Sequence, residues 1–116
     1  MLIDDDAEGL SRYAALLGQR GYVVAGAMSM TEARRLCGQQ TFDVLITDIR
    51  LQDGDGLTLM QALQAHCGGL RGIAMSRVAT PADIEESKAA GFAAHLIKPV
   101  DLPDLEAAVA KVLALE

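Results

Sequence analysis

The residues best suited to chemistry are acids, a hydroxyl and an amine, each placed directly after a short apolar run. Three consecutive aspartates, Asp4 to Asp6, follow the first run, and Asp48 ends a later one. Ser76 and Lys98 end two further runs in the same way. Carboxylates that are brought close together repel one another, so either one of them takes a proton or a cation binds.

Side chains of these types suit a metal ion and a phosphoryl group. Carboxylate oxygens are good ligands for Mg²⁺, which keeps several waters and leaves positions for phosphate oxygens. Lys98 supplies a compact positive charge, and Ser76 supplies a hydroxyl donor for phosphoryl oxygens. A carboxylate beside the metal, such as Asp48, can act as a nucleophile and form an aspartyl phosphate. The alternative is a solvated acidic cluster with Lys98 as a structural ion-pair partner.

The elements that must position these residues alternate along the whole chain. Short apolar runs occupy residues 1–3, 22–27, 43–48, 73–76 and 93–97. Amphipathic or capped helical segments follow them, at 8–19, from Ser29, after Gly56, from Thr80 and from Asp101. This alternation predicts an α/β fold with a doubly wound, five-stranded parallel sheet, in the flavodoxin-like order 2-1-3-4-5, and five helices. Because the carboxyl ends of parallel strands share one edge of the sheet, the acids, the hydroxyl and the amine should meet there.

Length and composition limit what the chain can be. Its 116 residues fit one domain, which we assign to residues 1–116, and 51% apolar residues are enough for a core. A net charge of −6 disfavours nucleic acid and anionic membrane surfaces as partners of this domain. No apolar run is long enough to span a membrane. Cys37 and Cys67 lack the spacing of a metal site, so we expect packed thiols and a cytoplasmic location.

In these features the chain resembles the receiver domain of bacterial two-component response regulators. Ile3-Asp4-Asp5-Asp6 resembles the acidic end of the first strand of that family, and Asp43 to Gly56 resembles its phosphoacceptor strand and loop. Lys98-Pro99 matches its Lys-Pro step, which is commonly a cis peptide that would aim the amine into the pocket. The stretch Ala90 to Val100 looks like the receivers of hybrid sensor histidine kinases in particular.

The resemblance implies a role for each acid. Asp48 would be the phosphoacceptor that becomes a 4-aspartylphosphate. Mg²⁺, for which Mn²⁺ could substitute, would bind Asp5 directly, Asp4 mainly through water, a carboxylate oxygen of Asp48 and the backbone carbonyl of Arg50. Asp6 would begin a helix rather than bind the metal.

The resemblance also implies a phosphoryl site and a switch. Ser76 and Lys98 would bind phosphoryl oxygens. Ser76 would then move toward the phosphoryl group, and the side chain at position 95 would enter the space that it leaves. His95 stands where an aromatic residue is usual, so we expect switching that is weak or sensitive to pH. The alternative is that His95 is merely exposed.

The implied function is phosphorelay signal transduction. Phosphoryl transfer from a histidine kinase or histidine phosphotransfer domain to Asp48 would switch the interactions of the face formed by residues 82–115, which is also a candidate homodimer surface. The domain would catalyse only its own phosphorylation and dephosphorylation. We expect the receiver module of a hybrid sensor histidine kinase; a stand-alone regulator or phosphate shuttle is the alternative. A Mg²⁺-dependent phosphatase would need an acid at position 50, where Arg50 stands, and a receiver-like docking module would not need the intact site.

Overall fold

The apolar runs form the parallel sheet that the sequence predicts. The computed structural model describes residues 1–66, 69–77 and 80–114. Its main sheet has five parallel strands in the order β2-β1-β3-β6-β7, which is the flavodoxin-like order. The strands are β1 (Leu2–Ile3), β2 (Gly26–Ala27), β3 (Val44–Asp48), β6 (Arg71–Ser76) and β7 (Phe92–Ile97). The predicted order and the number of parallel strands are confirmed.

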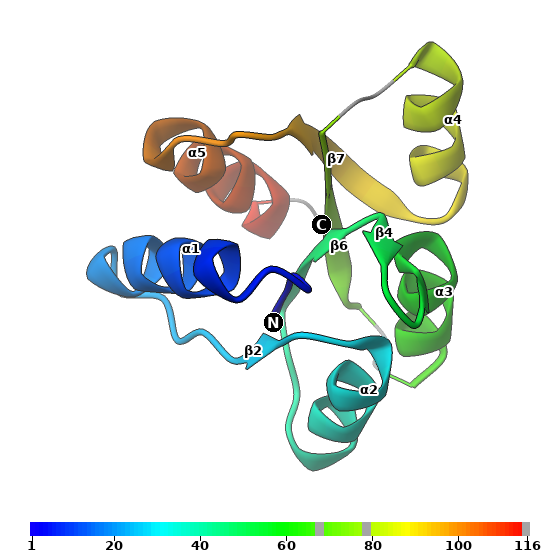
Figure 1. Cartoon of the computed structure of the whole chain (residues 1–116), viewed down its shortest axis with the longest axis horizontal. Coiled ribbons are helices and arrows are strands. Elements are labelled where there is room, and N and C mark those ends of the chain that lie inside the picture. Colours follow the sequence, from blue (N-terminus) through cyan, green and yellow to red (C-terminus); the bar gives the residue numbers. More distant parts are fainter. Residues whose placement is uncertain (67–68, 78–79, 115–116) are drawn as a thin grey trace.

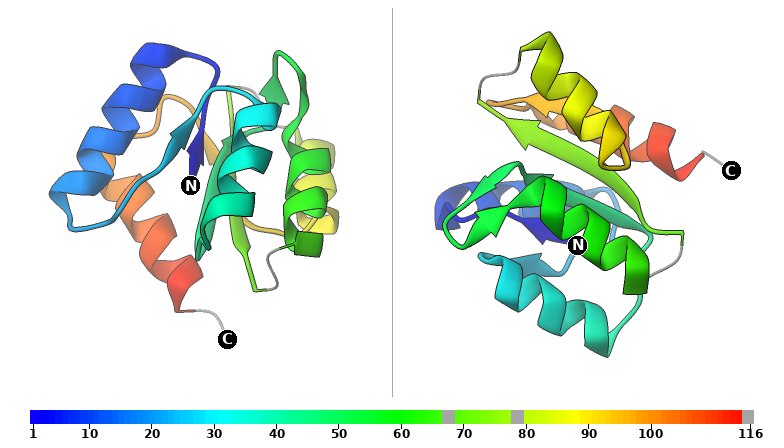
Figure 2. Two further views of the ribbon diagram at one scale, coloured as in Figure 1. Left: turned by 90° about the horizontal axis from the view of Figure 1, so that it is seen from below. Right: turned by 90° about the vertical axis from the view of Figure 1, so that its right-hand side faces the viewer.

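Five helices cover the two faces of this sheet, as expected (Figure 1). They are α1 (Ala7–Gln19), α2 (Met30–Gln39), α3 (Gly56–His66), α4 (Pro81–Ala89) and α5 (Leu102–Leu113). In the left view of Figure 2, α1 and α5 lie on one side of the sheet, and α2, α3 and α4 lie on the other. Each face therefore has its own aliphatic core, one around Leu59 and Met60 and the other around Leu105 and Val109.

The helix starts follow from local capping chemistry. Asp6, Ser29 and Asp101 each accept a backbone hydrogen bond as the N-cap residue of α1, α2 and α5. Thr80 and Asp83 form a reciprocal capping box at the start of α4. Asp6 therefore begins a helix, as the sequence predicts.

Two local features differ from the expectation. The predicted second strand over 22–27 pairs only at Gly26–Ala27, and the loop after β3 contains a small antiparallel hairpin of β4 (Arg50–Leu51) and β5 (Gly54–Asp55). The hairpin was not predicted because two-residue strands carry too little alternation to be recognised.

The cysteine prediction is wrong for Cys37, which is disulfide-bonded in α2. Spacing along the chain carries no information about which thiols the fold brings together, so no sequence pattern predicts that Cys37 is disulfide-bonded. Cys67 lies outside the described residues. Among the helices that are described, none is long and apolar enough to cross a membrane.

Candidate functional site

Strand pairing brings the predicted acids to one point at the centre of the sheet. β1 and β3 are parallel neighbours with Ile3 opposite Thr47, so Asp4 and Asp48 lie next to each other just beyond the pairing. The Asp4 amide donates to the carbonyl oxygen of Ala27 at 3.1 Å, which fixes the end of β1 against β2. One carboxylate oxygen from each of Asp4, Asp5 and Asp48 lies within 4.8 Å of the others.

Lys98 joins this cluster from the carboxyl end of β7, the second strand along the sheet from β3. Its Nζ lies 2.8 Å from Oδ2 of Asp4 and 2.7 Å from Oδ1 of Asp48, so one ammonium faces two carboxylates. The backbone amide of Lys98 donates to the carbonyl oxygen of Ser76 at 2.8 Å, which sets these two residues side by side. The Lys98–Pro99 peptide is cis, as the resemblance implied.

Burial and charge perturb the ionisation of all three groups. Asp4 is fully buried and Asp48 is 8% exposed. Burial, together with the neighbouring Asp4, raises the pKa of Asp48 to about 7 despite the ammonium beside it. Burial would also raise the pKa of Asp4, but its contacts with Asp48, Lys98 and the Asp6 amide outweigh this and lower it. Burial works to lower the pKa of Lys98, but the two carboxylates raise it.

This donor set fits a hard divalent cation. It consists of oxygen atoms only, from three carboxylates, which suits Mg²⁺. Within the part of the chain that is described, Oδ1 of Asp48 is buried and accepts no well-directed hydrogen bond, although it is ion-paired with Lys98. This buried oxygen has spare lone pairs and belongs to the carboxyl whose pKa is raised, so a cation would stabilise its charged form.

A single cleft of about 890 Å³ is lined by all the predicted metal and phosphoryl residues: Asp4, Asp5, Asp48, Arg50, Ser76 and Lys98. It lies at the carboxyl ends of the strands, where ligands of open α/β sheets bind. The arrangement can hold a cation on the acids and an anion on Lys98, which is the pairing that phosphoryl transfer requires.

His95 lies directly behind the cleft rather than in solvent. It is half-buried, and its Nε2 lies 2.8 Å from Oγ of Ser76. The interpretation of His95 as merely exposed is therefore wrong. The predicted switch pair of Ser76 and His95 is in direct contact.

Three residues that support the site were not identified from the sequence. A Cβ atom at Gly9 in α1 would lie 2.9 Å from Oδ2 of Asp4, and one at Gly56 would collide with the backbone carbonyl of Asp48. The Asp53 carboxylate accepts from the amides of Met30 and Thr31 at 3.0 and 3.3 Å, which ties the loop after β3 to the start of α2. These contacts join residues far apart in the sequence, so no local pattern predicts them.

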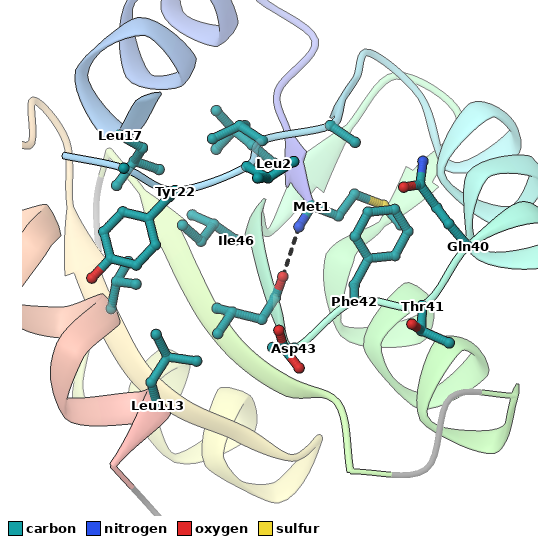
Figure 3. Close-up of a pocket in the computed structure, with 16 residues that line it drawn as sticks. Met1, Leu2, Leu17, Tyr22, Gln40, Thr41, Phe42, Asp43, Ile46 and Leu113 are labelled. Atoms are coloured by element: carbon teal, nitrogen blue, oxygen red, sulfur yellow. Dashed lines mark hydrogen bonds between the residues drawn. The ribbon is translucent and has the colours of Figure 1, made fainter. Parts of the chain in front are cut away.

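A second cavity lies at the opposite, amino ends of the strands (Figure 3). It measures about 340 Å³, and its walls are mainly apolar, with Leu17, Tyr22 and Ile46 among them. The Met1 ammonium donates to the carbonyl oxygen of Val44 at 2.7 Å; burial lowers its pKa to about 6, although nearby Asp43 acts to raise it. None of the predicted site residues lines this cavity.

Comparison with known proteins agrees with the geometry of this site. Residues 1–110 match the family model of the response regulator receiver domain. The transcriptional regulatory protein ZraR of Escherichia coli K12 is 30% identical over 114 residues, which is 98% of this chain and 26% of ZraR. The alginate biosynthesis transcriptional regulatory protein AlgB of Pseudomonas putida is 29% identical over 97% of this chain and 25% of AlgB. The chain thus spans about a quarter of the length of these curated relatives.

Solved structures share the fold across nearly the whole chain. A receiver domain protein from Methanospirillum hungatei superposes with a TM-score of 0.90 and 27% identity, covering 97% of this chain and 90% of that one. A response regulator from Burkholderia pseudomallei has a TM-score of 0.86 and 28% identity, covering 92% of this chain and 63% of the other. That structure contains a phosphorylated aspartic acid, a calcium ion and citrate.

Proposed function

The chain belongs to the response regulator receiver family, and on this premise we propose that Asp48 accepts a phosphoryl group from a phosphohistidine in a Mg²⁺-dependent reaction. The observation that carries the proposal is the position of the Asp48 carboxylate. It ends the central strand β3, lines the cleft, lies close to two further acids and is ion-paired with the Lys98 ammonium. A phosphorylated aspartic acid in the similar Burkholderia protein supports the same chemistry.

The metal in this proposal would be held by Asp5 and Asp48 directly and by Asp4 mainly through water, with the backbone carbonyl of Arg50 as a further ligand. Receiver domains generally bind Mg²⁺, and the all-oxygen donor set supports it in this chain. When bound, Mg²⁺ would neutralise negative charge on the phosphoryl oxygens. Mn²⁺, which accepts similar oxygen ligands, could take its place.

Side chains of the cleft accept the phosphoryl group and bind its oxygens. An oxygen of the Asp48 carboxylate attacks phosphorus, the bond from phosphorus to the histidine nitrogen breaks, and its electron pair returns to the departing imidazole. This requires Asp48 in its charged form, which the Lys98 ammonium favours. Lys98 and the hydroxyl of Ser76 then bind phosphoryl oxygens, because both line the same cleft as the acceptor. Slow hydrolysis of the aspartyl phosphate completes the cycle.

Receiver domains interact with histidine kinases or phosphotransfer proteins, and for this chain we propose such a protein as the donor. The responding surface would be the face of α4, β7 and α5, within residues 82–115, of which Leu115 lies outside the described residues. On this face Ile97 is 54% exposed, which suits a docking or homodimer surface. The setting within a hybrid sensor histidine kinase remains a prediction from the 90–100 stretch, and a stand-alone regulator remains its alternative.

Intact-mass measurement after incubation with acetyl phosphate tests the proposal. Wild type should gain one phosphoryl group in the presence of Mg²⁺ and none after chelation. Asp48→Asn should gain none, because the amide is a poor nucleophile of nearly the same shape. Asp43→Asn is the matched control, since Asp43 is an exposed acid at the other end of the same strand, and it should behave as wild type. An unmodified wild type, or full modification of Asp48→Asn, would overturn the proposal.

A further inference from the structure

A chain of hydrogen bonds runs from the cleft through His95 into helix α4. Oγ of Ser76 lies 2.8 Å from Nε2 of His95, and Nδ1 of the same ring lies 3.3 Å from Oγ of Ser87. The Ser87 hydroxyl in turn donates to the carbonyl oxygen of Ile84 at 2.8 Å. Ser87 is 1% exposed, so the end of this hydrogen-bond series in α4 is protected from water.

These contacts select one tautomer of the neutral ring. A serine hydroxyl has a single proton, and Ser87 uses its proton on Ile84. Ser87 therefore faces His95 with lone pairs, and Nδ1 of the ring must carry the hydrogen that is donated to it. A neutral imidazole has only one N–H, so Nε2 is left as an acceptor. It follows that the Ser76 hydroxyl spends its proton on His95 when the ring is neutral.

Protonation of the ring reverses the bond at Ser76. Both ring nitrogens of a charged histidine are donors, so Nε2 then donates to Oγ of Ser76. The bond from Nδ1 to Ser87 is kept, because Ser87 accepts in either state. The hydroxyl proton of Ser76 is released and can be donated to another acceptor in the cleft that Ser76 lines.

We propose that His95 is a positioning residue that controls Ser76: the neutral ring holds the Ser76 proton, and the charged ring frees it for a phosphoryl oxygen on Asp48. The inference rests on the proposed function and adds to it a regulation of the same site. Phosphorylation should therefore be favoured when His95 is protonated. Because Ser87 belongs to α4, the same series of hydrogen bonds links the phosphorylation state of Asp48 to the proposed docking face.

The surroundings of His95 favour the neutral form at rest. Burial lowers the pKa of His95, and Asp83 on α4 is the charged group that acts to raise it. The other charged residues that line the adjoining cleft come from every element around it: Glu86 from α4, Arg77 after β6, Lys98 after β7, Asp48 at the end of β3, Arg50 from β4, Asp55 from β5, and Asp4, Asp5 and Asp6 after β1. A dianionic phosphoryl group in that cleft would add negative charge and favour the protonated ring.

The test compares wild type with His95→Gln, whose side chain can bond to Ser76 but cannot titrate. The rate of Asp48 phosphorylation by acetyl phosphate is measured at saturating Mg²⁺ from pH 5.5 to 8. Both proteins share the titration of Asp48 and of the phosphodonor, so the ratio of wild type to variant isolates His95. We expect this ratio to rise by up to roughly tenfold toward low pH, the equilibrium equivalent of one hydrogen bond.

Two further measurements separate control from mere packing. Ser87→Ala removes the acceptor that fixes the tautomer, so the neutral ring can donate to Ser76 through Nε2 and the pH dependence of the ratio should shrink. Nitrogen chemical shifts of the ring in wild type should show Nδ1–H in the neutral state. Two results would overturn this inference alone. One is a neutral ring that carries its hydrogen on Nε2. The other is a wild type that is phosphorylated but whose rate depends on pH in the same way as that of His95→Gln. A wild type that is never phosphorylated would overturn the proposed function and this inference with it.

Discussion

The two ends of the parallel sheet carry cavities of opposite character. At the carboxyl ends, the larger cleft contains three aspartates and a lysine that is paired with two of them. At the amino ends, the smaller cavity has mainly apolar walls and contains one buried ammonium with a backbone partner (Figure 3).

The two ends differ in how far the protein itself neutralises their charged groups. At the amino end the Met1 amino group donates to the Val44 carbonyl oxygen, and burial lowers its pKa to about 6, so near neutral pH it carries little charge that would require a ligand. At the carboxyl end, one ammonium must serve two largely buried carboxylates, with Asp5 beside them. An excess of negative charge that the fold itself does not neutralise is what makes this end a site.

Added Mg²⁺ should stabilise the protein through the carboxyl end alone. Binding to the native state at a hundredfold excess over Kd raises the free energy of unfolding by about 2.7 kcal/mol. For a domain of this size that raises Tm by roughly 10 °C. Asp5→Ala should lose most of this gain by removing a direct ligand, whereas Asp43→Ala at the amino end should keep it. Thermal melts with and without Mg²⁺ check this, and equal gains in both variants would remove the contrast between the ends.

Lys98→Met should destabilise the metal-free protein by about 2 kcal/mol, because it leaves two buried carboxylates without their shared cation. Proton uptake by Asp48 limits the cost, since the pKa of that group is already raised. Lys88→Met is the control: its ion pair with Glu85 is exposed, so the change should be within about 0.5 kcal/mol. Urea unfolding measures both variants. Mg²⁺ should restore part of the loss in Lys98→Met, and phosphorylation should persist at a lower rate.

The affinity for Mg²⁺ should fall as the pH drops below about 7. The raised pKa of Asp48 means that the metal-free site holds a proton near neutrality, and the metal must displace it. Below that pKa the apparent Kd should rise by up to tenfold per pH unit. Calorimetric titrations in two buffers of different ionisation enthalpy would detect the released proton at pH 6.5. A Kd that is constant between pH 5.5 and 7.5 would contradict the raised pKa.

The same groups set the pH dependence of stability without metal. Because the folded-state pKa of Asp48 lies above its ordinary value, its contribution to stability is present at low pH and is lost as the pH rises from about 4 to about 7. Asp4 acts in the opposite sense: its lowered pKa contributes stability above its ordinary value, and this is lost as the solution is made more acid. Asp48→Asn should therefore raise the stability of the metal-free protein more at pH 8 than at pH 5.

The smallest effect separates two glycines of the same helix. Gly18→Ala meets no atom within 4 Å, so it should gain about 0.5–1 kcal/mol from helix propensity. Gly9→Ala would press its Cβ on the Asp4 carboxylate, which Lys98 holds in place, so this gain should vanish. Chemical denaturation measures both, and Gly9→Ala should also weaken Mg²⁺ binding. An equal gain at both positions would mean that Asp4 is free to move.

Sequence reasoning succeeded where chemistry follows from strand ends. Asp4, Asp48, Ser76 and Lys98 each end an apolar run, and topology alone brings such ends to one edge of a parallel sheet. It failed where a contact depends on how helices pack on that sheet. The approach of Gly9 to Asp4, the capping of α2 by Asp53 and the disulfide at Cys37 all join distant segments.

His95 shows both sides of this limit. Its position relative to Lys98 indicated a role next to Ser76, and the contact between them is present. Its second partner, Ser87, was not foreseen because it depends on the face that α4 turns toward β7. That second bond selects the tautomer, so the most specific property of this residue could not be predicted from the sequence.

The proposed function requires that Asp48, rather than Asp4, Asp5 or another acid, receives the phosphoryl group. Wild type is phosphorylated with acetyl phosphate and Mg²⁺ and then reduced with borohydride, which converts an aspartyl phosphate into homoserine. Peptide sequencing by mass spectrometry then locates the converted residue. We expect homoserine at position 48 and unchanged aspartate at positions 4, 5 and 43. Conversion at any of those three positions, or phosphorylation without conversion at position 48, would contradict it.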